Sequence, residues 1–344
     1  MGSRIRMVAL LATALLAPAA LADAGESCGG LPPIDATTSL LVVAPHPDDE
    51  TLCCAGVMQR VLAAGGHVSV VWITSGDGSE LSMLIVEKSV FAPREKVRDL
   101  AARRMQEARA ATALLGVQST QQLFLGYPDG VLKLLTDNRS TAYHAKFTGE
   151  TRVPYADALF PGHSYTGDSL EHDFEAVLER TRPTLVLAPS PADTHPDHRA
   201  SGMLAIRILT RRGELSKAHY WIVHGGEGWP SPRGYMPGIP LDMPPSGRGL
   251  ASTPFCLTDD EEARKLQAVR AYRSQMDVMS PFLLTFVRTS ELYFRDSGAL
   301  EHLQPAAALR EPWGGASDPI SDPTRRRSAP ADGRATRVAA SCGD

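Results

Sequence analysis

Apolar residues follow two alternating patterns along this chain, short uninterrupted runs and longer segments with helical spacing. An uninterrupted run of roughly four to eight apolar residues is typical of a strand buried on both faces, and apolar residues three or four positions apart are typical of a helix. The predicted strands are Ser39–Ala44, His67–Thr74, Gln122–Leu125, Thr184–Ala188 and Tyr220–Val223. The predicted helices are Thr51–Ala64, Glu95–Leu115, His198–Leu209 and Leu257–Tyr272.

This alternation predicts an α/β fold, in which a Rossmann-like, mostly parallel sheet is flanked by helices. Ligands of such sheets bind at the carboxyl ends of the strands, so functional residues are expected in the loops that follow the strands. The first strand is not followed by a G-x-G-x-x-G turn, and no nicotinamide cofactor is therefore predicted. Two segments without sustained periodicity, 136–167 and 225–253, are expected to form long loops over the site.

The two ends of the chain differ from the segment between them. Arg4 and Arg6 precede an apolar run, Met7–Ala20, that leads into Ala20-Leu21-Ala22. This layout is typical of a secretory signal, here residues 1–22, and the run is short for a membrane span. We therefore expect a secreted or periplasmic protein with no membrane span in the mature chain; an uncleaved membrane anchor is the alternative. One folded domain is predicted over 36–305, and the Pro- and Arg-rich segment 311–344 is expected to be a disordered tail.

The composition is that of an ordinary globular protein, with 43 % hydrophobic and 22 % charged residues. A formal net charge of -4 does not indicate nucleic acid or an anionic membrane as a partner, and the sequence predicts no particular oligomeric state.

The cysteines, at positions 28, 53, 54, 256 and 342, include no C-x-x-C pair and do not indicate a thiolate zinc site. Cys28 and Cys342 lie near the two mature ends and are candidates for a bridge in an oxidising compartment. The adjacent Cys53 and Cys54 are expected to pack in the core.

Imidazoles and carboxylates gather in two short clusters, each placed after a predicted strand. Pro45–Glu50 (PHPDDE) follows the first strand, and His195–His198 (HPDH) follows Thr184–Ala188 and a Pro-rich extension. A catalytic zinc takes three protein ligands, typically imidazoles and a carboxylate, and keeps a fourth position open. A further carboxylate beside it would serve as a general base and an imidazole as an acid. The alternative for the first cluster is a simple helix start, in which its acidic residues stabilise the N-terminal amides; the presence of the second cluster favours a metal site.

These motifs resemble the PIG-L/LmbE family of zinc-dependent N-deacetylases. The resemblance is carried by Ala44–Glu50 (APHPDDE) and by the HPDH motif downstream. The order and spacing of Thr74–Gly78 (TSGDG), Arg104–Ala108 (RMQEA) and Leu125–Gly130 (LGYPDG) agree with it. The resemblance covers about Leu40–Leu209, and it implies the fold, the metal and the roles of individual residues.

The resemblance implies that His46, Asp49 and His198 bind Zn²⁺, although two imidazoles and a carboxylate would also accept iron or cobalt. It further implies that Asp48 is the general base that takes a proton from the attacking water. His195 would stabilise the oxyanion or act as an acid toward the leaving nitrogen, with Asp197 orienting it. The alternative for His195 is a position next to a helix start without a chemical role.

Arg104 and Asp129 are weaker candidates for substrate binding. The family often uses an arginine near the sugar, which makes Arg104 a candidate; a surface ion pair with Glu107 is the alternative. Asp129 lies in a Pro-Asp-Gly turn, where it either has only a turn role or hydrogen-bonds sugar hydroxyls.

The function implied is hydrolytic removal of an N-acetyl group from an N-acetylated amino sugar of the GlcNAc type or from a glycoconjugate. One alternative is a zinc amidase that acts on another N-acyl glycoconjugate or a thiol conjugate, with an acyl pocket shaped by 136–167 and 225–253. Another is a non-catalytic carbohydrate-binding protein. Asp48 and His195 argue against the last alternative, because binding alone needs no spare base beside a metal.

Overall fold

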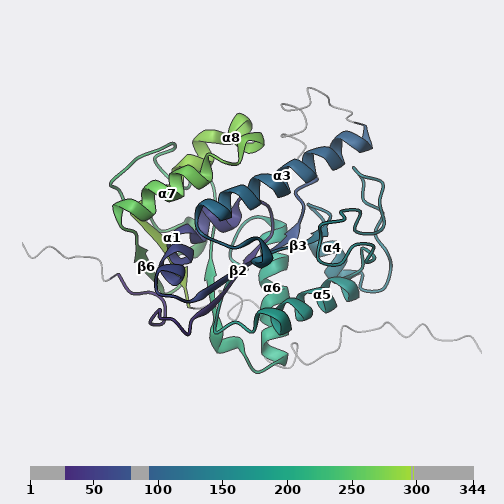
Figure 1. The fold of residues 1–344 in the computed structure, drawn as a ribbon, viewed down its shortest axis with the longest axis horizontal. Helices are drawn as coiled ribbons and strands as arrows, with labels where there is room; N and C mark the ends of the chain where they lie inside the picture. Colours follow the sequence, from purple (N-terminus) through teal and green to yellow (C-terminus); the bar gives the residue numbers. More distant parts are fainter. Residues whose placement is uncertain (1–27, 79–92, 296, 298–344) are drawn as a thin grey trace, which may run out of the picture. The chain divides into compact units, whose positions relative to one another are not determined.

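The sheet has seven strands within the part of the chain that the structure, a computed structural model, describes: residues 28–78, 93–295 and 297. Its strand order is β3-β2-β1-β4-β5-β7-β6, and Figure 1 shows β3 and β6 on opposite sides of β2. The strands are β1 (Ser39–Ala44), β2 (His67–Thr74), β3 (Gln122–Tyr127), β4 (Leu185–Pro189), β5 (Ala218–Trp221), β6 (Ser252–Cys256) and β7 (Ser290–Phe294). The strands β1 to β5 pair in parallel, and β7 pairs antiparallel with β5 and with β6. The predicted mostly parallel sheet is confirmed.

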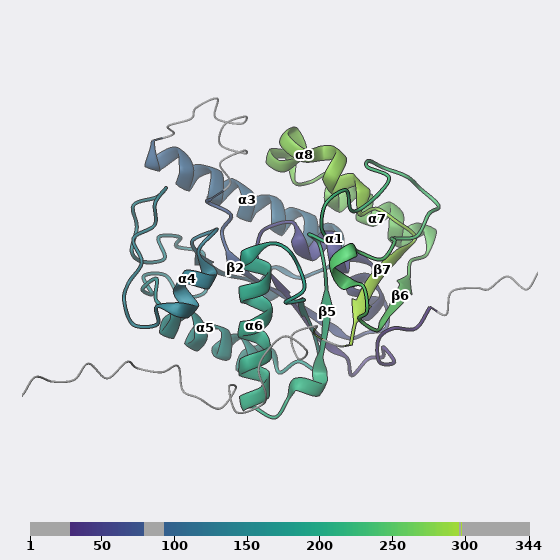
Figure 2. The ribbon, with the colours of Figure 1, turned by 180° about the vertical axis from the view of Figure 1, so that it is seen from behind.

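Helices cover both faces of this sheet. They are α1 (Asp49–Ala63), α3 (Arg94–Leu114), α4 (Leu132–Asp137), α5 (Gly167–Thr181), α6 (Pro196–Arg211), α7 (Asp259–Val269) and α8 (Arg273–Thr285). Figures 1 and 2 show α1, α3, α7 and α8 together on one face and α4, α5 and α6 on the other. The order of the strands explains this division. The chain moves from β1 to β3 in one direction and from β4 to β5 in the other, and right-handed crossovers then place the helices on opposite faces.

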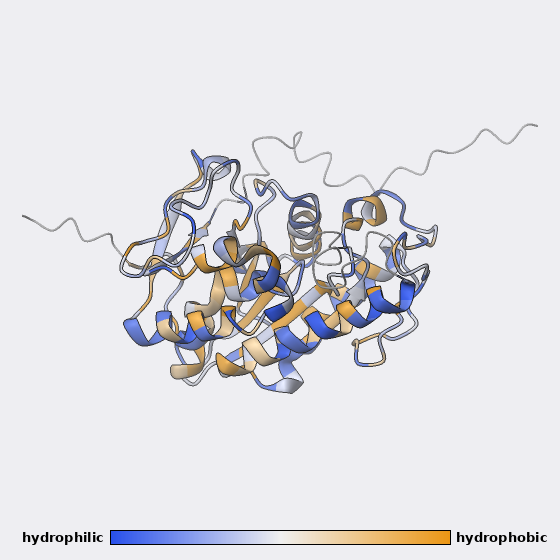
Figure 3. Ribbon diagram, turned by 90° about the horizontal axis from the view of Figure 1, so that it is seen from above, coloured by the Kyte–Doolittle hydropathy of each residue, from blue (hydrophilic) through white to orange (hydrophobic). Residues whose placement is uncertain are grey.

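The core forms because the central strands are buried on both sides. Leu40–Ala44 is fully buried, with α1 packed on one side of it, and β2 is buried from Val68 onward. Figure 3 shows the apolar residues concentrated in the strands and in the inner sides of the helices. Uninterrupted apolar runs are thus the expected pattern for these strands.

Several boundaries differ from those predicted. The strand predicted at Tyr220–Val223 lies two residues earlier, and the helix predicted over Leu257–Tyr272 is shorter, Asp259–Val269, and is followed by a separate helix, α8. The turn at 270–272 separates the two helices, and Thr258 caps α7 with a complete capping box. The segment 225–253 is mostly irregular, with the single 3₁₀ turn Pro245–Gly247 and the start of β6. Between the end of α4 and the start of α5, the segment 138–166 contains one isolated β-bridge, between Arg152 and Ser164, and is otherwise irregular.

The cysteine pairing differs from the expected one. Cys28 forms a disulfide with Cys256 at the end of β6, with the two Cα atoms 5.4 Å apart, so the expected bridge to Cys342 was wrong. The reason is that the chain before β1 runs along β6, where Gly30 packs closely against Thr253. Cys53 and Cys54 are buried in the core as expected, and these two neighbours form a disulfide with each other.

The predicted signal segment, 1–22, and the predicted tail, 311–344, lie outside the described residues, as does the last part of the predicted domain, 298–305. Among the described helices, none combines the length and the apolar character that crossing a membrane requires.

Candidate active site

The two motif loops meet at the centre of the sheet. They follow β1 and β4, which are neighbouring parallel strands, and the chain leaves these two strands toward opposite edges of the sheet. Such a switch in strand order opens a crevice at the carboxyl ends of the strands. The side chains of Pro45–Glu50 and of His195–His198 therefore come together although about 150 residues separate them in the sequence.

Three atoms from these loops form a nearly equilateral triangle. His46 Nδ1 lies 3.2 Å from Asp49 Oδ2 and 3.3 Å from His198 Nε2. The remaining side, between Asp49 Oδ2 and His198 Nε2, measures 3.2 Å. All three side chains are buried. These are the three residues that the sequence predicts as metal ligands.

The triangle has the size that a tetrahedral metal ion requires. Metal–nitrogen and metal–oxygen bonds of about 2.0–2.1 Å with tetrahedral angles place neighbouring ligand atoms about 3.3 Å apart. Two imidazoles and a carboxylate are also a typical donor set for a catalytic zinc. The residues present therefore fit a divalent metal bound on this triangle. Each corner of the triangle also belongs to a neighbouring group whose atoms are close enough to hold an ion. These groups are His46 with His195 and His198, Asp49 with His198 and His224, and His46 with Asp129 and Asp197.

Asp193 orients the imidazole of His198 from behind. Its Oδ2 atom lies 3.1 Å from His198 Nδ1 and accepts hydrogen bonds from the backbone amides of Val223 (2.9 Å) and His224 (3.0 Å). Although burial alone would raise the pKa of Asp193, the facing His198 imidazole holds it below its usual value. A carboxylate that holds the second nitrogen of a ligating histidine fixes its tautomer, here with the Nε2 lone pair toward the triangle.

Two carboxylates face the other nitrogen of His46. His46 Nε2 lies 3.1 Å from Asp129 Oδ1 and 3.3 Å from Asp197 Oδ2. Asp197 is fully buried and also accepts hydrogen bonds from the amides of Gly130 (2.6 Å) and Leu132 (3.0 Å). His46 therefore has its Nδ1 toward the triangle and its Nε2 toward the loop that follows β3.

Asp48 is buried beside the triangle without being one of its corners. Its backbone has a φ of 137°, in the left-handed region that residues other than glycine rarely adopt. This conformation sends the Asp48 and Asp49 side chains in different directions. Burial and the neighbouring Asp49 carboxylate raise the pKa of Asp48 well above its usual value, as suits a group that takes up a proton near neutral pH.

His195 occupies the N-cap position of α6 and is partly exposed. Its Nδ1 atom accepts a hydrogen bond from the backbone amide of Asp197 at 3.2 Å. Burial, together with the charges of His46 and His198, lowers the pKa of His195 to about 4. The ring is therefore neutral at physiological pH, and because Nδ1 is an acceptor, the proton is on Nε2.

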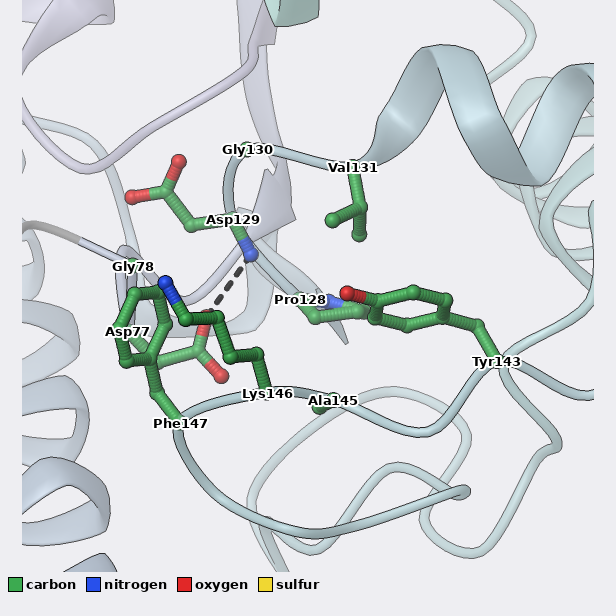
Figure 4. A pocket seen from close by; sticks show the side chains of 10 residues that line it. All are labelled: Asp77, Gly78, Pro128, Asp129, Gly130, Val131, Tyr143, Ala145, Lys146 and Phe147. Carbon is green, nitrogen blue, oxygen red and sulfur yellow. Dashed lines mark hydrogen bonds between the residues drawn. The ribbon is translucent and has the colours of Figure 1, made fainter.

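A cavity of about 230 Å³ lies on the Asp129 side of the triangle. Figure 4 shows that it is enclosed by the turns after β2 and β3 and by the segment 143–147. Its polar lining includes the carboxylates of Asp77 and Asp129, and Tyr143 and Phe147 add aromatic surface. Asp77 Oδ1 accepts the backbone N–H of Asp129 at 2.8 Å, which holds the two turns together.

Residues 41–209 match a family model described as PIG-L: GlcNAc-PI de-N-acetylase. The chain carries a PIG-L domain. Among curated proteins, it is 28 % identical over 205 residues to a 1D-myo-inositol 2-acetamido-2-deoxy-alpha-D-glucopyranoside deacetylase of Kribbella flavida, covering 58 % of this chain and 61 % of the relative. It is 25 % identical over 184 residues to the diacetylchitobiose deacetylase of Thermococcus kodakarensis, covering 53 % of this chain and 52 % of the relative. The chain thus spans about half to three fifths of the length of these relatives.

A solved structure shares the fold of the PIG-L domain. The crystal structure of the A40926 pseudoaglycone deacetylase Dbv21 aligns with a TM-score of 0.50 at 18 % sequence identity. The alignment covers 75 % of this chain and 96 % of that chain. It extends the likeness in fold beyond the segment that matches the family model.

All the site residues predicted from the sequence lie inside the PIG-L segment, but the structure changes two of their expected contacts. The Asp197 carboxylate does not orient His195, because it points from the first turn of α6 toward Gly130 and His46; only the backbone amide of Asp197 contacts His195. Arg104 is buried behind the loops, where it donates to the carbonyl of Gly76 at 2.6 Å, and it is not among the residues that line the described cavity.

Two contacts of the PIG-L domain were not expected from the sequence. Glu107 accepts hydrogen bonds from Ser274 on α8 instead of pairing with Arg104. Asp193, the partner of His198, was missed as well. Its signal was its place two residues before the HPDH motif, in the same loop after β4.

Proposed function

We propose that this chain is a metal-dependent hydrolase that removes an N-acetyl group from an N-acetylated amino sugar or glycoconjugate. The observation that carries the proposal is the triangle of His46, Asp49 and His198, with Asp48 and His195 beside it. The names of the curated relatives support this reaction class, since both are deacetylases of N-acetylated sugars. A binding protein would need the metal ligands at most, whereas Asp48 and His195 are the groups that an amide hydrolysis uses.

Zinc is the proposed metal. His46, Asp49 and His198 would hold it, and the donor set and the triangle of about 3.3 Å suit its tetrahedral preference. When bound, such an ion polarises an amide carbonyl and makes water acidic enough to be activated near neutral pH. Iron and cobalt accept the same donors, so the metal is tested directly below.

The two side chains beside the triangle have different proposed roles: Asp48 transfers the proton, and His195 stabilises the oxyanion. Asp48, with its raised pKa, takes a proton from the water that attacks the acetyl carbon. His195 is neutral and carries its proton on Nε2, so it donates a hydrogen bond to the oxyanion that develops on the carbonyl oxygen. As the C–N bond breaks, Asp48 returns its proton to the departing nitrogen. The products are acetate and the free amino sugar.

The cavity beside Asp129 is the proposed sugar site. Its volume of about 230 Å³ lies below the usual range of small-molecule pockets, roughly 300–1,000 Å³, which suits a single sugar ring better than a larger group. The carboxylates of Asp77 and Asp129 can accept hydrogen bonds from sugar hydroxyls, and the Tyr143 and Phe147 rings offer apolar surface to a sugar face.

We also propose that the protein is exported. The basic and apolar pattern of residues 1–22 supports this location, and so does the Cys28–Cys256 disulfide, since such bridges persist in oxidising compartments. N-terminal sequencing of the protein from the medium or the periplasm should give a start near Asp23. Recovery of the intact chain from the cytoplasm or from membranes would contradict export with cleavage.

The experiment that tests the proposed reaction is acetate release from N-acetylated amino sugars, as monomers, oligomers and polymers, with longer N-acyl analogues beside them. The apo-protein is loaded separately with zinc, iron and cobalt, and Asp48→Asn is compared with the parent at equal metal content. We expect acetate release by the parent and a loss of about 100-fold or more in the variant, because general-base catalysis contributes about 10²–10⁴-fold. Release of only longer acyl groups would favour the other amidase, and metal binding without any release would favour a binding protein.

A further inference from the structure

The peptide between Pro47 and Asp48 is held from both sides. Its carbonyl oxygen, on Pro47, accepts a hydrogen bond from Gln275 Nε2 at 2.5 Å and a longer one from Arg104 at 3.4 Å. Its N–H, on Asp48, donates to Glu50 Oε2 at 3.2 Å. On the far side of Asp48, its own carbonyl accepts the amides of Thr51 and Leu52 at the start of α1. Both peptide groups that flank Asp48 are therefore fixed.

The hydrogen bonds to these two peptide groups explain how Asp48 keeps an unfavourable backbone conformation. A non-glycine residue with a φ of 137° persists only where the surroundings determine it. This conformation fixes where the Asp48 carboxylate points relative to that of Asp49, so that Asp49 can lie at the triangle while Asp48 faces the reacting water. The contacts of the Pro47–Asp48 peptide thus set the direction of the proposed base.

Glu50 is well suited to act as a fixed acceptor. It is fully buried, and its Oε2 atom also accepts Trp72 Nε1 at 2.8 Å. Its Oε1 atom accepts the hydroxyls of Thr51, at 2.6 Å, and of Tyr272. Four donors surround the carboxylate, so it cannot turn away from the Asp48 amide without leaving buried donors unpaired.

The hydrogen bond to the Pro47 carbonyl comes from Gln275, which lies outside the segment that matches the family model. Gln275 lies on α8, and it is buried. The first turn of α8 is anchored on α3 by Ser274, which donates to Glu107 through its backbone amide (3.0 Å) and its hydroxyl (2.6 Å). The C-terminal helices therefore contribute to the geometry of the site although none of their residues lies at the metal triangle.

We propose that Glu50 and Gln275 are positioning residues, which clamp the Pro47–Asp48 peptide and thereby aim the Asp48 carboxylate at the reacting water. This inference rests on the proposed function and adds to it a requirement for the C-terminal part of the chain. It also gives Glu50 a role beyond the stabilisation of a helix start.

The test compares Gln275→Met with Ser274→Ala. Methionine keeps the length of the side chain but cannot donate to Pro47. Ser274→Ala removes the hydroxyl bond to Glu107 in the same turn of α8, but it keeps the backbone amide bond to Glu107 and the contact of Gln275 with Pro47. We expect kcat to fall about 10- to 100-fold in Gln275→Met, with KM and metal content unchanged, because a small misplacement of a reacting group has a cost of this order. The Ser274→Ala variant should keep kcat within about threefold. Gln275→Glu, which turns the donor into an acceptor, gives the same comparison if the methionine variant does not fold.

A pair of variants at Glu50 provides the matched comparison for the hydrogen bond to the Asp48 N–H. In Glu50→Gln the amide oxygen can still accept the Asp48 and Trp72 N–H groups, and the amide nitrogen can donate to the hydroxyls of Thr51 and Tyr272. Glu50→Met removes every acceptor at similar size. We expect Glu50→Gln to recover most of the kcat that Glu50→Met loses.

Crystal structures of the same variants supply a readout that does not depend on activity. We expect the φ of Asp48 to leave the left-handed region in Gln275→Met and in Glu50→Met. The proposal is overturned if Gln275→Met keeps the parental kcat, if its loss follows metal content or KM instead, or if Asp48 keeps its φ in both variants. A parent protein without amidase activity would defeat the proposed function, while the crystal structures would still decide whether the clamp holds Asp48.

Discussion

Asp193→Asn isolates the contribution of a buried carboxylate to metal binding. In the parent, Asp193 Oδ2 meets His198 Nδ1 and the amides of Val223 and His224, and Oδ1 accepts the amide of His195 at 2.8 Å. An asparagine with its oxygen in the Oδ2 place keeps the first three contacts. It loses the charge behind His198 and turns an NH₂ group toward the His195 amide, so His198 becomes a weaker metal ligand.

The expected loss of metal affinity in Asp193→Asn follows from these contacts. Loss of a carboxylate behind a ligating histidine typically lowers metal affinity by 10- to 100-fold, or about 1.4–2.7 kcal/mol. Asp193→Ala would be less informative, because it leaves the buried amides of Val223 and His224 without an acceptor, at about 1–3 kcal/mol each. Its loss of stability would then be confused with its loss of affinity.

The assay is competition between the protein and a chelator of known affinity, with thermal unfolding of the metal-free proteins measured in parallel. Thr194→Ala is the control in the same loop, since its exposed hydroxyl contacts only the His224 carbonyl among the described contacts. We expect a weaker metal affinity in Asp193→Asn alone, with the metal-free Tm close to that of the parent. Equal affinities in the parent and Asp193→Asn would refute the reasoning that this carboxylate strengthens His198 as a ligand.

Three further predictions concern the other groups of the site and the disulfide. His195→Ala should lower kcat by about 10²–10³-fold at unchanged metal content, because it removes the proposed oxyanion donor; loss of metal instead would place His195 among the ligands. Asp129→Asn should raise KM for the amino sugar about tenfold through the loss of a charged acceptor in the cavity, as steady-state kinetics at matched metal content will show. The Cys28–Cys256 bridge, with a sequence separation of 228, should contribute about 5 kcal/mol to the free energy of unfolding. Urea unfolding should therefore show a large loss on reduction in the parent and only a small one in Cys256→Ser, where the Cys53–Cys54 bridge closes too short a loop to constrain the unfolded chain.

The central strands were predictable because a parallel sheet covered on both faces needs uninterrupted apolar runs, and Ser39–Ala44 and His67–Thr74 are such runs. The helix α5 was missed although its sequence carried the signal: Leu170, Phe174 and Val177 have helical spacing behind the N-cap residue Thr166. The strands β6 and β7 carry no comparable signal. Their residues are a mixture of polar and apolar side chains, and β6 pairs only with β7 at the edge of the sheet.

The convergence of His46, Asp49 and His198 was predictable because these residues lie inside two short motifs, each in a loop after a central strand. The contacts of Gln275 were not, since nothing near this residue in the sequence indicates that α8 packs beside the loop after β1. That contact depends on α7 and α8 lying on the same face of the sheet as α1 and α3 (Figure 2). Local motifs thus identify the reacting groups, and long-range packing determines how they are held.

Asp197 shows why a role carried over from a motif needs the structure. His195 lies two positions before it in the sequence, but its carboxylate accepts the amides of Gly130, in the turn after β3, and of Leu132, at the start of α4. That turn also carries Asp129, and the two carboxylates meet at His46 Nε2. The turn that carries Asp129 and the proposed metal ligand His46 are therefore joined through Asp197. A substrate that displaces Asp129 would change the surroundings of His46 directly, so we expect substrate binding in the cavity and metal affinity to be coupled through the contacts of His46 with Asp129 and Asp197.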